Sequence, residues 1–136
     1  MAHKDIELIL VRQLASRLAV PVFVVDTEGD LLYFNEPAEQ LLGRRFDEVD
    51  EMPFVTWTTA FLPRDEQGRE MPVESIPLVA AIRRRRPVHG NLRIVGLDGI
   101  GRTIEVTAFP LEGSGGRQLG AVAMFWESDG VAGRAS

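Results

Sequence analysis

The sequence contains no cysteine and only two histidines. Without thiols, cysteine catalysis, structural disulfides, cysteine-ligated zinc and iron–sulfur clusters are all excluded. The histidines, His3 and His89, lie far apart, and no His-Glu-x-x-His pattern is present, so a two-histidine metal site at helical spacing is not possible. The sequence therefore predicts a protein that is not an enzyme and has no metal site.

Long apolar runs and an excess of positive charge are also missing. No apolar stretch approaches the roughly 20 residues that a membrane-spanning helix needs, and Asp5 and Glu7 interrupt the start of the chain where a signal peptide would be apolar. Fifteen Lys and Arg against 20 Asp and Glu give a formal net charge of -5, which does not favour binding to nucleic acid. We therefore expect a cytoplasmic protein that binds neither a membrane nor nucleic acid.

The composition that remains is that of one globular domain, because 45% of the 136 residues are hydrophobic and 26% are charged. Apolar periodicity predicts helices over residues 4–19, 37–42 and 75–86, with one or two short helices within 44–63 and a loop over 64–70. Strands are predicted over residues 22–26, 31–35, 88–96, 102–111 and 118–126. This order predicts an α+β fold with helices on one face of the sheet.

The first predicted helix has a wider apolar surface than the flank of a small domain requires. Ile6 and Ile9 fall toward its polar side, while Leu10 and Leu14 widen its main apolar face. Exposed apolar residues at this density indicate an interface. We therefore predict that residues 1–20 form an amphipathic dimerisation arm of a symmetric homodimer, with a domain over 21–127 and a flexible tail over 128–136.

Several short motifs, in order, resemble a PAS domain of the bacterial signalling type over residues 15–127. Asn35 is suited to cap the helix that follows it, and Gly43 to end that helix. The motifs are Asp26-Thr27-Glu28-Gly29-Asp30-Leu31, Asn35-Glu36-Pro37-Ala38-Glu39, Leu42-Gly43, Asp65-Glu66-Gln67-Gly68, Ile76-Pro77-Leu78, Asp98-Gly99 and Phe109-Pro110-Leu111. The resemblance implies a five-stranded antiparallel sheet in the order 2-1-5-4-3, with helices enclosing a pocket. It also implies a sensory or dimerisation module that acts on a kinase, a phosphatase or a transcription regulator.

PAS domains bind haem, flavin or small metabolites, or only dimerise. The resemblance therefore does not identify a cofactor, and the residues present determine whether each one could bind. A cysteinyl-flavin adduct is excluded by the missing cysteine, and the only asparagines available to hold a flavin ring are Asn35 and Asn91. Haem members that the sequence resembles carry the axial ligand on the longer helix, where this chain has aliphatic residues and then Arg83–Arg86. We therefore expect no cofactor, with His89 as a surface residue.

A ligand pocket is the remaining candidate site, and core packing is the alternative explanation for the same residues. Tyr33 and Thr107 are the expected polar contacts of a small hydrophobic ligand. The candidate pocket consists of Tyr33, Trp57, Ile82, Leu92, Thr107 and Met124. The rival function is a cone-shaped α+β enzyme or ligand carrier with a curved-sheet cavity, which the lack of a histidine on the late strands disfavours.

Two charged runs have simple structural interpretations. The acids Asp47, Glu48, Asp50 and Glu51 lack the alternating layout of a calcium loop and are expected to be a solvated helix. The basic run Arg83–Arg86 lies at a predicted helix end, where cations complement the helix dipole. Docking on an acidic partner is the alternative for this basic run.

Overall fold

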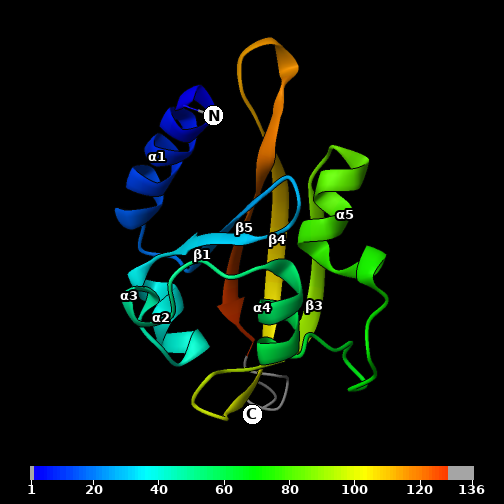
Figure 1. Cartoon of the computed structure of the whole chain (residues 1–136). Coiled ribbons are helices and arrows are strands. Elements are labelled where there is room, and N and C mark those ends of the chain that lie inside the picture. The colour runs from blue at the N-terminus through cyan, green and yellow to red at the C-terminus, as the bar shows by residue number, and fades with distance from the viewer. Residues whose placement is uncertain (1, 129–136) are drawn as a thin grey trace.

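A five-stranded antiparallel sheet forms the centre of the computed structural model, which describes residues 2–128 and the side chains of residues 6–128. The strands are β1 (Val22–Asp26), β2 (Leu31–Phe34), β3 (Val88–Val95), β4 (Gly101–Glu112) and β5 (Gln118–Glu127). Their order is β2-β1-β5-β4-β3, as Figure 1 shows, which confirms the predicted topology. Of the predicted tail, only Ser128 lies within the described residues.

The helices divide between the two faces of this sheet. One face carries α2 (Glu36–Leu42), α3 (Phe46–Val49), α4 (Phe54–Phe61) and α5 (Pro77–Arg84), and α1 (Ala2–Ser16) lies on the other. We call the first face the inner face and the second the outer face. In Figure 1, α4 and α5 lie in front of the strands, while α1 stands beside them.

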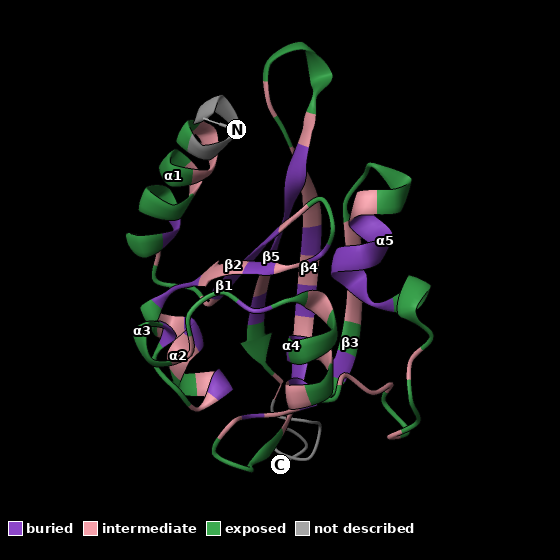
Figure 2. Ribbon diagram, viewed as in Figure 1, coloured by how far each residue is buried: buried purple, intermediate pink, exposed green. Residues whose placement is uncertain are grey.

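Strand alternation builds the main core on the inner face. Ile104, Val106 and Ala108 of β4 are buried against the helices, as the alternating sequence predicts. Figure 2 shows that buried residues concentrate on α5 and on the strands behind it. A second, smaller core lies on the outer face, where Ala15 of α1 packs with Val22, Val24 and Val122.

The start of α5 differs from the prediction, which placed the helix N-cap at Ser75. Ser75 instead belongs to a 3-10 turn, Val73–Ser75, and Ile76 is the residue that precedes α5. The amide of Ile76 donates to the carbonyl of Val73 at 3.1 Å, which closes this turn. Pro77 then begins the helix, because its fixed φ suits the first helical position and its missing N–H costs nothing there.

The helix α2 ends as the sequence predicts, at Gly43 with a φ of 81°. A Cβ added at Gly43 would lie 2.7 Å from the backbone nitrogen of Asp98 in the β3–β4 turn. We expect Gly43→Ala to lower the free energy of unfolding by about 2–3 kcal/mol, since it adds a clash to the strain of a positive φ. Chemical denaturation would measure the loss.

Gly99→Ala provides the matched control for this substitution. Gly99 has a φ of 82°, but nothing lies within 4 Å of its added Cβ. This variant therefore isolates the conformational strain, and we expect a loss of about 1 kcal/mol. Equal losses for the two variants would show that the contact between Gly43 and the β3–β4 turn is not tight.

Candidate functional site: an apolar cavity under the sheet

A small cavity of about 60 Å³ lies between the inner face of the sheet and the helices. Every residue that lines it is apolar. The lining consists of Phe23, Leu42, Trp57, Phe61, Pro63, Ile76, Pro77, Leu78, Leu92, Ile94, Ile104, Val106, Ala123 and Phe125. Because a bound water needs two or more polar partners, such a cavity favours small apolar molecules over water.

Trp57 forms one wall of the cavity and is fixed from two directions. Its indole Nε1–H donates to the carbonyl oxygen of Gly29 at 2.8 Å, so its only polar atom is already satisfied. Its ring meets Phe23 edge-on with 5.0 Å between centroids, and meets Phe54 in the same way at 5.4 Å. The indole therefore offers a rigid apolar surface to the cavity, and no free hydrogen-bond donor.

The structure brings together only part of the predicted pocket. Trp57 and Leu92 both line the cavity. Ile82 is half-buried against the same core and lines a separate surface hollow beside Gly29 and Phe54. Of the six predicted pocket residues, only Trp57 and Leu92 thus line the cavity.

The other three predicted pocket residues, Tyr33, Thr107 and Met124, are not among those that line the cavity. Thr107 pairs with Met124 across β4 and β5, and both alternate with the buried inward residues of their strands, so they lie on the outer face. Tyr33 packs with the outer core as well as with the edge of the inner core. The expected polar contacts to a ligand are therefore absent from the described cavity.

Residues that the sequence analysis missed supply most of the lining. Ile104, Val106, Ala123 and Phe125 come from β4 and β5, where strict alternation assigns them to the inner face. The same alternation excludes Thr107 and Met124 from that face. This signal was present in the sequence and could have identified the strand residues of the lining.

The polar side chains on the outer face have partners of their own. The Nδ1 atom of His89 lies 2.8 Å from the hydroxyl oxygen of Thr107, and the His89 side chain is exposed. His89 is therefore on the face opposite the cavity, as a surface residue, whereas the side chain of His3 lies outside the described residues. At the opposite edge of the sheet, on β2, burial raises the pKa of the Tyr33 phenol, and the Arg12 guanidinium lies 4.7 Å from the centre of that ring.

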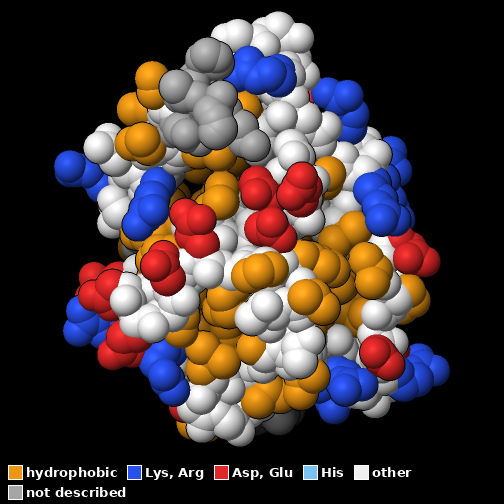
Figure 3. Space-filling model, in the orientation of Figure 1, with side chains coloured by type: hydrophobic (Ala, Val, Ile, Leu, Met, Phe, Trp, Pro, Cys, Tyr) orange, Lys and Arg blue, Asp and Glu red, His pale blue; other side chains and the backbone are white. Residues whose placement is uncertain are grey.

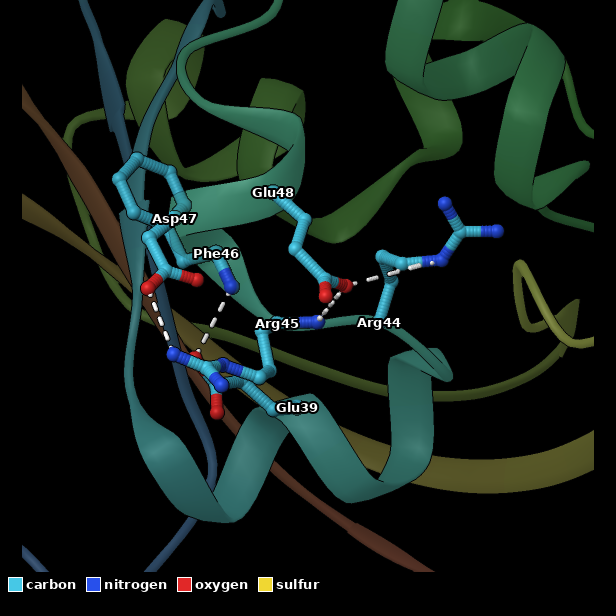
Figure 4. Close-up of polar contacts among 6 residues, drawn as sticks. All are labelled: Glu39, Arg44, Arg45, Phe46, Asp47 and Glu48. Carbon is cyan, nitrogen blue, oxygen red and sulfur yellow. Dashed lines mark hydrogen bonds and ion pairs between the residues drawn. The ribbon is translucent and has the colours of Figure 1, made fainter.

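Asp47 and Glu48 of the predicted acidic helix lie beside the arginines that precede it, as Figure 4 shows, whereas Asp50 is the C-cap of α3 and Glu51 follows the helix. Asp47 accepts a hydrogen bond from Arg45 at 2.7 Å, and Glu48 lies 4.0 Å from Arg44. The backbone amide of Phe46 donates to Glu39 at 2.9 Å, which connects α2 to the first turn of α3. These exposed charges lie at the corner between the two helices.

A second acidic group occurs at the β1–β2 turn, where carboxylate oxygens of Asp26, Glu28 and Asp30 lie within 4.8 Å of one another. Asp26 accepts hydrogen bonds from the amides of Glu28 and Asp30, and Asp30 accepts one from the amide of Phe54 at 2.7 Å. The hairpin and the start of α4 thus account for Asp26 and Asp30, whereas the side chain of Glu28 is exposed.

The basic run lies at the C-terminal end of α5, and Figure 3 shows basic side chains gathered along that edge of the molecule. Arg83 and Arg84 occupy the last turn of the helix, where cations are favourable. Arg85 donates to the carbonyl of Gly116 at 3.1 Å and thereby connects α5 to the β4–β5 loop. This placement agrees with the helix-end interpretation, and docking on an acidic partner remains a prediction.

A second candidate surface lies on α1, where four large apolar side chains project into solvent. Ile6, Ile9, Leu10 and Leu14 are 59%, 53%, 59% and 63% exposed. The opposite side of the helix packs Val11 and Ala15 on the outer core. We call the four exposed residues the α1 stripe. In the part of the chain that the structure describes, no helix is both long and apolar enough to cross a membrane.

Comparison with known proteins identifies the fold. The sequence profile of the family described as the PAS fold matches residues 15–128. A LOV protein from Rhodobacter sphaeroides superposes with a TM-score of 0.70 at 16% identity, over 95% of this chain and 73% of that chain. The PAS domain of BvgS from Bordetella pertussis gives 0.66 at 18% identity, over 95% and 91%. A PAS domain from a two-component sensor histidine kinase gives 0.60 at 13% identity, over 91% and 98%. No curated protein matches the sequence.

Proposed function

The chain belongs to the PAS family, and on that basis we propose that it is a sensory module that dimerises through α1 and binds a small apolar molecule in its cavity. The family is in general sensory and not catalytic, and the chain has the fold of a signalling sensor module.

The apolar cavity is the observation that carries the proposal. About 60 Å³ is well below the roughly 150 Å³ of an engineered cavity that accepts benzene. The volume and the wholly apolar lining therefore favour a molecule of a few heavy atoms without charge. A flavin or a haem is far larger than this space, which supports the prediction that the chain has no cofactor.

The partner is proposed by analogy with the structural relatives. One of them is a PAS domain from a two-component sensor histidine kinase. We propose that this chain likewise regulates a signalling protein, such as a kinase, a phosphatase or a transcription regulator. A cytoplasmic location is part of the same proposal. The rival architecture, a cone-shaped enzyme or carrier, is not supported, because the sheet has the order of a PAS domain.

Xenon is the sharpest probe of the cavity, because it is small, apolar and binds by filling space. Under xenon pressure, we expect methyl NMR signals of Leu92, Ile94 and Ile104, which line the cavity, to shift. Methyl signals of Val22 and Val24 in the outer core should stay in place. Shifts of equal size in both cores would contradict a defined site.

Ala123→Val is the matched control, since it directs two extra methyl groups into the cavity from β5. This variant should remove the xenon shifts without unfolding the domain. Native mass spectrometry of the protein purified from cells would complement the test, because it detects a retained natural ligand and the oligomeric state together.

A further inference from the structure

Asn35 is a fully buried polar residue, with 0% of its surface exposed, and it is the only polar or charged residue in the buried set of the described chain. It follows β2 and acts as the N-cap of α2, as the sequence predicts. A buried amide is costly unless its donors and acceptors are all satisfied. The partners of Asn35 therefore show what this residue holds together.

The side-chain oxygen of Asn35 faces the elements that line the cavity. Oδ1 accepts hydrogen bonds from the amide of Val22 at 2.9 Å and from the amide of Ala38 at 3.2 Å. Val22 immediately precedes Phe23 of β1, and Ala38 lies about one helical turn before Leu42 of α2. Both Phe23 and Leu42 belong to the cavity lining.

The side-chain nitrogen of Asn35 faces α1 on the other side of the sheet. Nδ2 donates to the carbonyl of Ala15, in the last turn of α1, and to the carbonyl of Val20 in the segment that leads into β1, both at 2.9 Å. The four bonds use the full capacity of the amide, two accepted by oxygen and two donated by nitrogen. One planar group thus joins the cavity-lining elements to the helix that carries the α1 stripe.

From this geometry we propose that Asn35 is the positioning residue that couples the cavity to α1. A change in cavity volume displaces β1 or α2, and the rigid amide passes the displacement to Ala15 and Val20, because the alternative is to leave a buried group without its partner. The identification of the cavity as the signal input rests on the function proposed above. The coupling itself does not depend on any ligand, so it is tested without one.

Asn35→Ser separates the two sides of the amide. A serine hydroxyl caps a helix well and can keep the bond to Ala38, but it is too short to reach the carbonyls of Ala15 and Val20. We expect amide hydrogen exchange in residues 6–16 to become about tenfold faster or more relative to exchange in β4. Asn35→Asp keeps the size and the acceptors but, when ionised, has no donor for either carbonyl. It should do the same and serves if the serine variant folds poorly. Asn91→Ser, on an exposed position of β3, is the matched control and should leave α1 unchanged.

A double-mutant cycle tests the coupling directly. Ala123→Val alters the cavity and, with Asn35 present, should change α1 exchange several-fold. In the Asn35→Ser background, the same cavity change should have no effect on α1. The proposal is overturned if Ala123→Val changes α1 exchange by the same factor in both backgrounds, or leaves it unchanged when Asn35 is present. If the coupling is observed but xenon does not bind, the proposed ligand site is refuted and the coupling through Asn35 is not.

Discussion

Replacing Trp57 by alanine is expected to lower the free energy of unfolding by about 3–5 kcal/mol, the typical cost of removing a large aromatic side chain from a core. Trp57 is only 5% exposed and packs against Phe23 and Phe54. Its removal also leaves the carbonyl of Gly29 without the hydrogen bond that the indole donates. The space that the indole vacates would be continuous with the existing cavity, so the surrounding side chains cannot easily fill it. Urea or guanidinium denaturation measures the loss.

Two further variants complete this test: one is a control on the same helix, and the other separates the hydrogen bond from the apolar packing. Val55→Ala lies on the same helix at a position that is 68% exposed, and we expect a change of less than about 0.5 kcal/mol. Trp57→Phe keeps most of the apolar surface but removes the hydrogen bond to Gly29, which should cost about 1–2 kcal/mol. A loss below about 1 kcal/mol for Trp57→Ala itself would show that the indole is not part of the core.

The sheet and most helices could be predicted because their signals are local. The alternation of Ile104, Val106 and Ala108 assigns an inward face, and a Gly-containing turn joins β1 to β2. Asn35 and Gly43 mark the two ends of α2 by their capping chemistry. The start of α5 was misplaced, because a serine shortly before a proline can be either a cap or part of a preceding turn.

The site was harder to predict, because it depends on which face of a strand each residue occupies relative to elements far away in the sequence. The predicted pocket includes Thr107 and Met124, although their strand positions place them on the outer face. The second role of Asn35 gives no local signal, since its bonds to Ala15 and Val20 join residues 20 and 15 positions apart. Such contacts emerge only when α1 folds back over the sheet.

The α1 stripe leads to the second large effect, which concerns assembly. We expect the full chain to be a dimer at tens of micromolar. Ile6→Asp combined with Leu10→Asp should weaken the dimer about 100-fold or more, because two carboxylates from each chain would have to be buried in an apolar contact. Analytical ultracentrifugation measures both the mass and the affinity. The double variant should keep its fold, since both side chains are more than half exposed in the single chain.

A control is needed to show that the dimer is weakened by the loss of the apolar contact and not by the added negative charge alone. Val55→Asp combined with Thr56→Asp adds the same two charges to exposed positions of α4, on the opposite face of the sheet from α1, so this protein should remain a dimer. Substitution is also a cleaner test than deletion of the helix, because deletion would expose Val22, Val24 and Val122, which Ala15 covers. A full chain that sediments as a monomer, or a dimer that survives the change at Ile6 and Leu10, would refute dimerisation through α1. Because the coupling through Asn35 acts within one chain, it would still connect the cavity to α1 in a monomer, and the stripe would then be a surface for a different protein.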